Sequence, residues 1–86
     1  MRQLERTLKA LANRRRLAIV EFLREKEEAP VWEIANKIKL SLKATSKHLG
    51  ILFAADIVDR DQRSLEMFYR LSKDQPSGAK QIISLL

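Results

Sequence analysis

Residues 30–54, PVWEIANKIKLSLKATSKHLGILFA, carry the pattern that decides the fold. In the first half, apolar residues recur at the spacing of one helix face: Ile34, Ala35 and Ile38. Pro30 suits the first turn of that helix because its missing N–H would have no partner there. Ser41 is a favourable N-cap for a second helix, over 41–54, whose apolar face repeats at i, i+4, i+7 and i+8: Thr45, Leu49, Leu52 and Phe53. The segment therefore predicts two helices joined by a tight turn near Lys39.

The charge of this segment is one-sided. No acidic residue occurs between Glu33 and Asp56, a window that holds four lysines: Lys37, Lys39, Lys43 and Lys47. Residues 1–55 carry twelve Lys or Arg against six Asp or Glu, and residues 56–86 carry five against five, so the formal net charge of +6 arises in the first part. A surface that serves only solubility usually mixes both signs. The pattern favours a polyanionic partner such as nucleic acid.

Two more helices are predicted ahead of this segment. The first carries an apolar stripe at alternating spacings of three and four: Met1, Leu4, Leu8 and Leu11. It ends near Asn13, which can cap the next helix. The inner face of the second helix is supplied by Leu17, Val20 and Phe22 or Leu23, ahead of the charged run 24–28.

From residue 57 onward the apolar period changes to two, which is typical of strands. We therefore expect a β-hairpin over 57–71, with a polar turn within 61–64. Residues 72–78 read as a loop because they contain Pro76 and Gly78. Residues 79–86 are predicted to form a short helix that exposes four apolar side chains: Ile82, Ile83, Leu85 and Leu86.

The whole pattern is mainly α with a small β-hairpin: a winged helix-turn-helix of about five helices plus a two-stranded wing. We expect residues 1–86 to form a single DNA-binding domain. The helix 41–54 would lie in the major groove, and its exposed side chains are contact candidates: Lys43, Ser46, Lys47 and His48. At the wing tip, Arg60 and Arg63 would approach neighbouring phosphates or the minor groove.

Three stretches together resemble the ArsR family of winged-helix repressors. LKALANRRRLAIVEFL is similar to the opening helices of that family, LSLKATSKHLGIL to its recognition helix and DIVDRDQRSLEMFYRLS to its wing. The similarity covers about residues 4–72, and the joint order of the segments is more specific than any one of them. It implies a sequence-specific, dimeric transcriptional regulator, which we expect to be a repressor.

The resemblance also implies which residues of the recognition helix contact DNA. The matching positions are Ser41, Leu42, Lys43, Ala44, Ser46, Lys47 and His48. Leu42 replaces a glutamine and Ala44 replaces a hydroxyl residue, so two potential hydrogen bonds are absent. Leu42 has two open interpretations: contact with a thymine methyl group, or cover for the core in line with Thr45 and Leu49.

A few residues outside this helix also have more than one interpretation. At least one of Arg14, Arg15 and Arg16 is a candidate for phosphate contact, although Arg16 is similar to a family position that is often structural. Trp32 is interpreted as a packing residue under the third helix. Gly50 costs about 1 kcal/mol relative to alanine inside a helix, which suggests a close approach of another backbone.

A homodimer is predicted because the two ends of the chain are apolar. The segments 1–12 and 79–86 are the expected dimerisation segments, with these interface candidates: Leu4, Leu8, Leu11, Ile82, Ile83 and Leu85. Small domains without disulfides or metals commonly gain their stability from a partner subunit, and the family resemblance agrees.

No cofactor and no metal site is expected, although metal sensors are common in the family the chain resembles. Where those sensors place a cysteine pair, this chain has residues 29–33, and the terminal segment offers only Lys80, Gln81 and Ser84 in place of Asp, His and Glu. One histidine without cysteine cannot form a closed zinc site. Control by an unidentified small molecule or a protein partner stays open.

Other classes of function fit less well. A winged-helix module for protein interaction, with DNA contact secondary, is the main alternative, and an RNA-binding module would use more than the five aromatic residues present. An enzyme is the least expected class because paired carboxylates in an apolar setting are lacking. No apolar run is long enough to span a bilayer and no signal-peptide pattern is seen, so we expect a cytoplasmic, nucleoid-associated protein without membrane contact.

Overall fold

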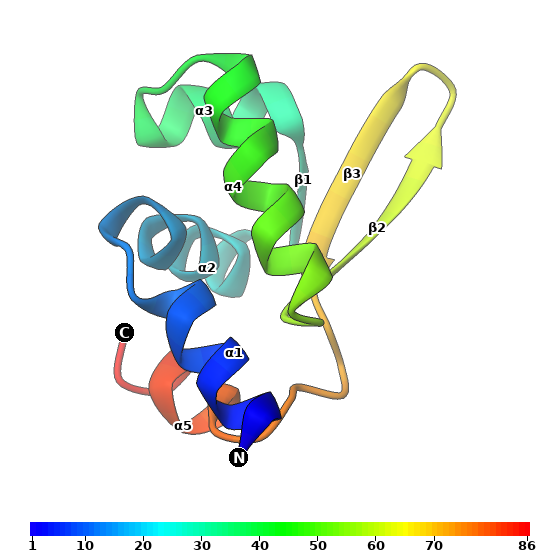
Figure 1. The fold of residues 1–86 in the computed structure, drawn as a ribbon. Coiled ribbons are helices and arrows are strands. Elements are labelled where there is room, and N and C mark those ends of the chain that lie inside the picture. The colour runs from blue at the N-terminus through cyan, green and yellow to red at the C-terminus, as the bar shows by residue number, and fades with distance from the viewer.

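Five helices and three strands follow one another in the computed structural model, which describes all of residues 1–86 (Figure 1). They are α1 (Arg2–Leu11), α2 (Arg14–Lys26), β1 (Glu28–Pro30), α3 (Val31–Ile38), α4 (Leu42–Ala54), β2 (Val58–Arg63), β3 (Glu66–Leu71) and α5 (Ala79–Ile83). The five helices and the hairpin confirm the predicted winged helix-turn-helix. The last helix is shorter than the sequence pattern indicated, since it ends at Ile83.

Two side chains start helices as predicted. The Oδ1 atom of Asn13 accepts hydrogen bonds from the backbone N–H groups of Arg15 at 2.9 Å and Arg16 at 3.1 Å. The Oγ atom of Ser41 accepts one from the N–H of Ala44 at 3.1 Å. Each cap satisfies helix N–H groups that have no partner within the helix. The starts of α2 and α4 are thus fixed locally.

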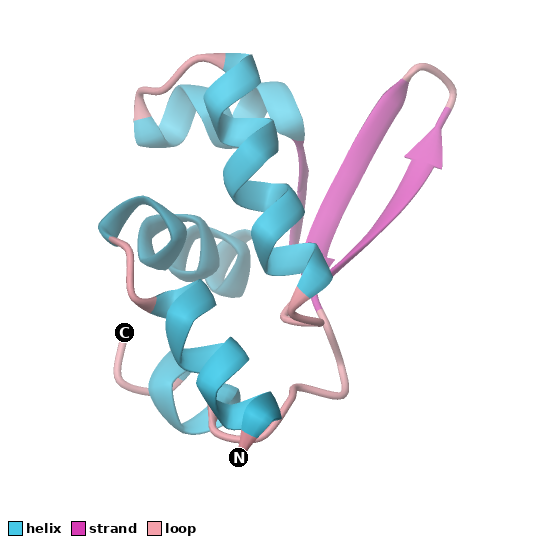
Figure 2. Cartoon of the chain, in the orientation of Figure 1, coloured by secondary structure: helices cyan, strands magenta, loops and turns pink.

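The sheet has one strand more than the sequence predicted. β1, β3 and β2 are antiparallel neighbours in that order (Figure 2), and Ala29 pairs with Tyr69. Pro30 is the last residue of β1 and the N-cap of α3, in extended conformation, so its predicted place in the first helical turn is wrong by one residue. A three-residue strand is too short to show a periodic pattern. Its pairing with β3 joins residues that lie far apart in the sequence. This strand anchors the base of the wing to α3.

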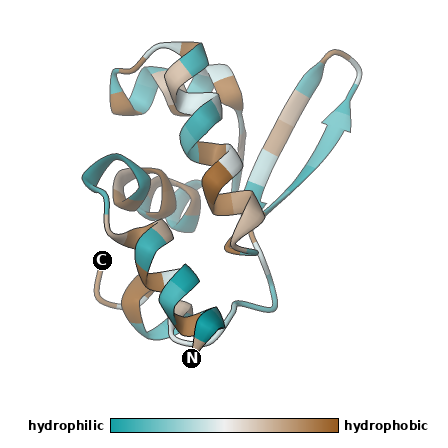
Figure 3. Ribbon diagram, viewed as in Figure 1, coloured by the Kyte–Doolittle hydropathy of each residue, from teal (hydrophilic) through white to brown (hydrophobic).

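A single apolar core joins the helices to the base of the sheet. Figure 3 shows the contrast between the mainly apolar α5 and the hydrophilic β2. Val20 and Leu23 are buried on α2 as predicted, Ile19 is buried beside them, and Leu17 and Phe22 are partly buried against the same core. On α4 the buried residues are Thr45, Leu49 and Leu52. The opposite side of α4 is exposed, at Leu42, Lys43, Ser46 and Lys47.

Several connections between these elements contain residues with positive φ. Four residues other than glycine have positive φ values: Glu27, Lys39, Asp56 and Ser64. Gly78, at the N-cap of α5, has φ of +85°, and a Cβ atom there would lie 2.6 Å from Cδ1 of Leu4. Glycine is favoured at this position by its backbone conformation, and a larger residue would also have to displace the side chain of Leu4. Both chain termini lie at this end of the molecule, away from the wing tip (Figure 1).

Candidate DNA-binding surface

The turn between α3 and α4 sets the angle at which α4 is presented. Lys39 has a left-handed backbone, with φ of 55°, and the N–H of Leu40 donates to the carbonyl of Ala35 at 3.0 Å. Ala35 on α3 and Thr45 on α4 are both buried, and the two helices pack against each other. The N-terminal turns of α4 are thereby held at the surface.

The exposed side of α4 is cationic and unpaired. Lys43, Ser46 and Lys47 are exposed, and their side chains form no hydrogen bond or ion pair within the chain. Ser41 is exposed, but its hydroxyl caps the helix, and Ala44 is half-buried. We call the exposed side chains of Leu42, Lys43, Ser46 and Lys47 the reading face. Since no carboxylate neutralises the two lysines, their charges are available to an anionic ligand.

His48 contributes to this region in a different way. Its Nδ1 lies 3.2 Å from Nη1 of Arg16 on α2. A guanidinium can only donate, so Nδ1 accepts and the ring proton of neutral His48 lies on Nε2. Partial burial, followed by the charges of Arg16 and Arg15, lowers the pKa of His48 below its usual value of 6.5. The side chain is therefore neutral at pH 7 and joins α2 to α4.

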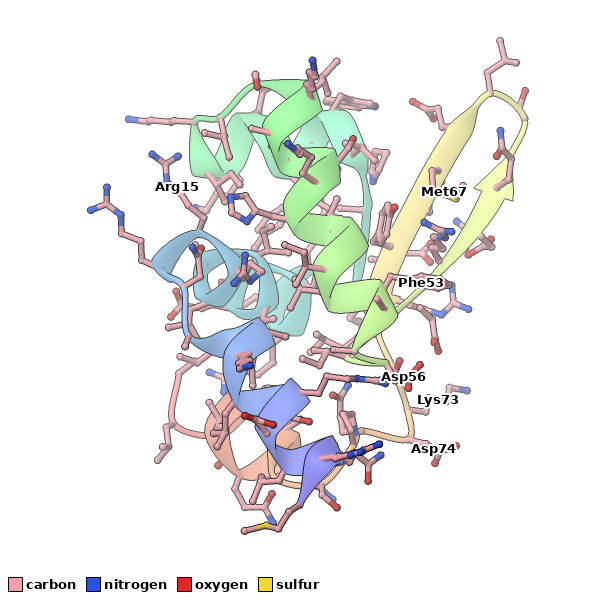
Figure 4. All side chains as sticks on the ribbon, in the orientation of Figure 1. Arg15, Phe53, Asp56, Met67, Lys73 and Asp74 are labelled. Atoms are coloured by element: carbon pink, nitrogen blue, oxygen red, sulfur yellow. The ribbon has the colours of Figure 1, made fainter.

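Arg16 is occupied inside the chain, which agrees with its structural interpretation. Its Nε donates to the carbonyl of Ala10 at 2.6 Å and its Nη2 to that of Lys9 at 3.3 Å. Arg14 is exposed, and Arg15, labelled in Figure 4, extends away from the start of α2. Neither has an ion-pair partner. Of the three arginines, Arg14 and Arg15 are the ones free to meet a phosphate.

The two wing arginines lie on opposite faces of the sheet, because residues three apart in a strand alternate in direction. The guanidinium of Arg60 lies over the ring of Phe53 on α4, 3.8 Å from its centroid, and has no carboxylate partner. Figure 4 shows Phe53 between α4 and the base of the wing. Arg63 points to the outer face. The sequence pattern did not distinguish Arg60 from Arg63, whereas in the fold they lie on opposite faces of the sheet and have different partners.

Arg63 is held by two carboxylates. Its Nη1 and Nη2 donate to Glu28 on β1 at 2.7 and 2.8 Å, and its Nε donates to Asp61 at 2.9 Å. Asp61 also accepts from Arg70 at 2.6 Å, and Arg63 lies over the ring of Phe68, 4.5 Å from its centroid. The hydrogen bond from Arg63 lowers the pKa of Glu28, and those from Arg70 and then Arg63 lower the pKa of Asp61. We call this group the wing network, and in it the charge of Arg63 is already compensated.

Trp32 is not the packing residue that the sequence suggested. Its side chain is 52% exposed, and its Nε1 donates to Oε1 of Glu66 on β3 at 2.8 Å. This hydrogen bond ties the start of α3 to the wing across 34 positions of sequence. Single-residue patterns give no signal for such a contact, and the role of Glu66 was missed.

The expectation for Gly50 is also wrong. A Cβ atom at this position would have no atom within 4 Å outside its own helix turn. No other part of the chain approaches this point of α4, so the glycine is not needed for packing within the chain.

The predicted dimer residues fall into two groups. Leu11 and Ile83 are buried in the core of the chain itself, so their assignment to a partner surface is corrected. Leu8 and Leu85 are exposed, and Leu4 and Ile82 are half-buried. The apolar stripe on α1 is wide enough for one edge to lie in the core while the other edge stays exposed, which explains the division on this helix.

No group of three or more His, Cys, Asp or Glu side chains is arranged to hold a metal ion. The helices are all too short or too polar to cross a membrane.

Residues 13–60 match the sequence profile of the bacterial regulatory protein, arsR family. This region contains α2, α3 and all of α4. The chain belongs to the ArsR family. The transcriptional activator HlyU of Vibrio cholerae is 37% identical over 79 residues, which is 92% of this chain and 69% of that protein. NolR, a nodulation protein of Rhizobium meliloti, is 39% identical over 78% of this chain and 54% of its own length.

Solved structures of ArsR-family proteins have the same fold. The structure of HlyU superimposes with a TM-score of 0.83 and 34% identity over 96% of this chain and 86% of that one. A homodimeric winged helix-turn-helix DNA-binding domain of a possible ArsR-family regulator from Mycobacterium bovis superimposes with a TM-score of 0.82 and 29% identity, covering 96% of this chain and 73% of the other. The chain is therefore a winged helix-turn-helix transcriptional regulator of this family and not an enzyme, as the sequence predicted.

Proposed function

We propose that the chain reads a specific sequence of double-stranded DNA as a homodimer, with the helix 41–54 in the major groove and the wing 57–71 on the flanking DNA. The observation that carries this proposal is the reading face, where Lys43 and Lys47 have no acidic partner. Neutralising a phosphate releases counterions, so free cations contribute directly to DNA affinity.

An α-helix fits the major groove of B-DNA, and the N-terminal residues of a recognition helix contact base edges. The residues at that end of α4 are Ser41, Leu42, Lys43, Ala44, Ser46, Lys47 and His48. We assign direct contacts to the reading face. Ser41 and His48 act mainly by holding the helix, because the Ser41 hydroxyl and the His48 Nδ1 are engaged within the chain.

For the wing, we assign the phosphate contact to Arg60. Arg63 would have to leave Glu28 and Asp61 to reach DNA, and breaking three charge-assisted hydrogen bonds opposes that movement. Its role is to stiffen the hairpin.

The proposed dimer uses the exposed parts of segments 1–12 and 79–86, with Leu8 and Leu85 at its centre and Leu4 and Ile82 beside them. A two-fold dimer would present two recognition helices to a palindromic site, with half-sites about 10 base pairs apart or a multiple of that. The homodimer from Mycobacterium bovis supports this arrangement.

We propose repression as the mode of regulation, with action at the nucleoid in the cytoplasm. Related proteins include the arsenical resistance operon repressor of Bacillus subtilis, 26% identical over 91% of this chain, and also the activator HlyU. An effector, if one acts, would be a small molecule or a protein partner.

The proposal is tested by selecting bound duplexes from a random library with the purified chain. We expect an enriched palindrome in which each protomer contacts one half-site. We also expect sedimentation to show a dimer at tens of micromolar. Equal binding to all duplexes, or no binding at modest salt, would instead support a protein-interaction module. The variant Lys73→Ala, which removes a cation outside α4 and the wing, serves as the control with an unchanged consensus.

A further inference from the structure

We infer that Leu42 contacts the 5-methyl group of a thymine, and so makes one position of each half-site specific for thymine. The inference rests on the proposed function, because it requires α4 to lie in the major groove. It concerns the first residue of α4, immediately after the N-cap Ser41.

The side chain of Leu42 does not cover the core. It is 57% exposed. Thr45 and Leu49, which follow it at helical spacing along α4, are completely buried. The apolar stripe of the helix therefore extends one turn beyond the core, and its last member projects from the protein. The interpretation of Leu42 as cover for the core is therefore wrong, and the contact with a thymine methyl group is the one that remains.

Within residues 42–48, Leu42 is the one large apolar side chain, and it lies beside polar and cationic neighbours. Ser46 is one helical turn further on, and it is exposed together with Lys43 and Lys47. Those three side chains can meet phosphates or hydrogen-bonding base edges. In the major groove, the thymine methyl is the apolar group presented by a base pair, so it is the partner that matches leucine.

The test removes the methyl group from DNA without changing base pairing. In a selected duplex, each thymine is replaced by deoxyuridine in turn, and the affinity of the wild-type chain is measured. At one position per half-site we expect the affinity to fall by about fourfold, the factor expected when one methyl-sized group loses its burial. The variant Leu42→Ala should bind the thymine and deoxyuridine duplexes equally.

Two further variants make the test specific. Leu42→Gln should change the selected base at that position from thymine to adenine, because glutamine pairs with the N6 and N7 edge of adenine. Lys73→Ala, outside α4 and the wing, serves as the control and should keep the methyl dependence. Thermal unfolding of each variant should match wild type, since Leu42 and Lys73 are both exposed.

Wild-type binding with no methyl dependence at any thymine would overturn the inference alone. A methyl dependence that persists in Leu42→Ala would also overturn it. Failure of the wild-type chain to bind any duplex would overturn it together with the proposed function.

Discussion

The recognition helix and the wing both carry basic residues, but the fold treats them differently. On α4, Lys43 and Lys47 have no carboxylate near them. On the wing, Arg63 is paired with Glu28 and Asp61, and Arg70 with Asp61. Arg60 lies between the two cases, over an aromatic ring and without an acidic partner. The comparison shows that a basic residue in the sequence is available to an anionic ligand only where folding leaves its charge without an acidic partner.

The largest effect is expected from the reading face. Lys43→Ala and Lys47→Ala should each lower DNA affinity by about tenfold per phosphate contact at 0.1 M salt and reduce the salt slope by about one unit per contact. Affinity measured between 50 and 200 mM salt checks this. If both variants bind like wild type while Lys73→Ala does too, the reading face is not the DNA contact.

A smaller effect should separate the two wing arginines. Arg60→Gln is expected to lower affinity several-fold with little change of consensus, as for a phosphate contact. The double variant Glu28→Gln, Arg63→Gln removes an ion pair without changing net charge, and we expect its affinity to stay within about twofold of wild type, because neither side chain is assigned a contact with DNA. A greater loss in the double variant than in Arg60→Gln would reverse these assignments.

Acidification should affect α4 before it affects the wing. The pKa of His48 is lowered in the folded chain, so its contribution to stability is present above about pH 6.5 and is lost as the pH falls through the folded pKa. The pKa values of Glu28 and Asp61 are lowered from 4.5 and 3.8, so the wing network stays ionised at pH 5.5. Between pH 7.5 and 5.5 the thermal midpoint of wild type should fall more than that of His48→Gln. An equal fall would remove His48 as the cause.

The smallest effect on affinity is expected from Gly50→Ala. Since nothing in the chain lies near the added Cβ, the variant should gain up to about 1 kcal/mol in free energy of unfolding. Unchanged DNA affinity, measured by titration, would restrict the contact surface to the first turns of α4. A loss of affinity despite higher stability would show that DNA itself approaches Gly50.

Features set by neighbouring residues could be predicted from the sequence. The caps Asn13 and Ser41, the helical period of α4 and the alternation in the hairpin depend on residues within a few positions of one another. Features that depend on distant residues could not. Glu28 is 35 positions from Arg63, and Trp32 is 34 from Glu66, so neither pairing leaves a periodic signal.

The same limit applies to the candidate site: exposure along α4 could be predicted, but the partners of its side chains could not. Lys43, Ser46 and Lys47 are exposed on α4 as helical spacing indicated. The partners of His48 and Arg63 decide whether those side chains are free, and they come from other elements. Leu11 and Ile83 show the same limit, because an apolar pattern does not distinguish a core of the chain from a surface for its partner.

The positive φ angles in the turns identify positions where substitution can raise the stability of the protein. The chain has two glycines, and four turns have positive φ at residues other than glycine: Glu27, Lys39, Asp56 and Ser64. A left-handed backbone costs an L-residue roughly 1–2 kcal/mol, more than the extra freedom that glycine would give the unfolded chain. Ser64→Gly at the exposed hairpin tip therefore offers a gain in thermal stability that leaves the reading face untouched. Replacing such turn residues with glycine would raise the free energy of unfolding, and this gain could offset destabilising substitutions elsewhere in the chain.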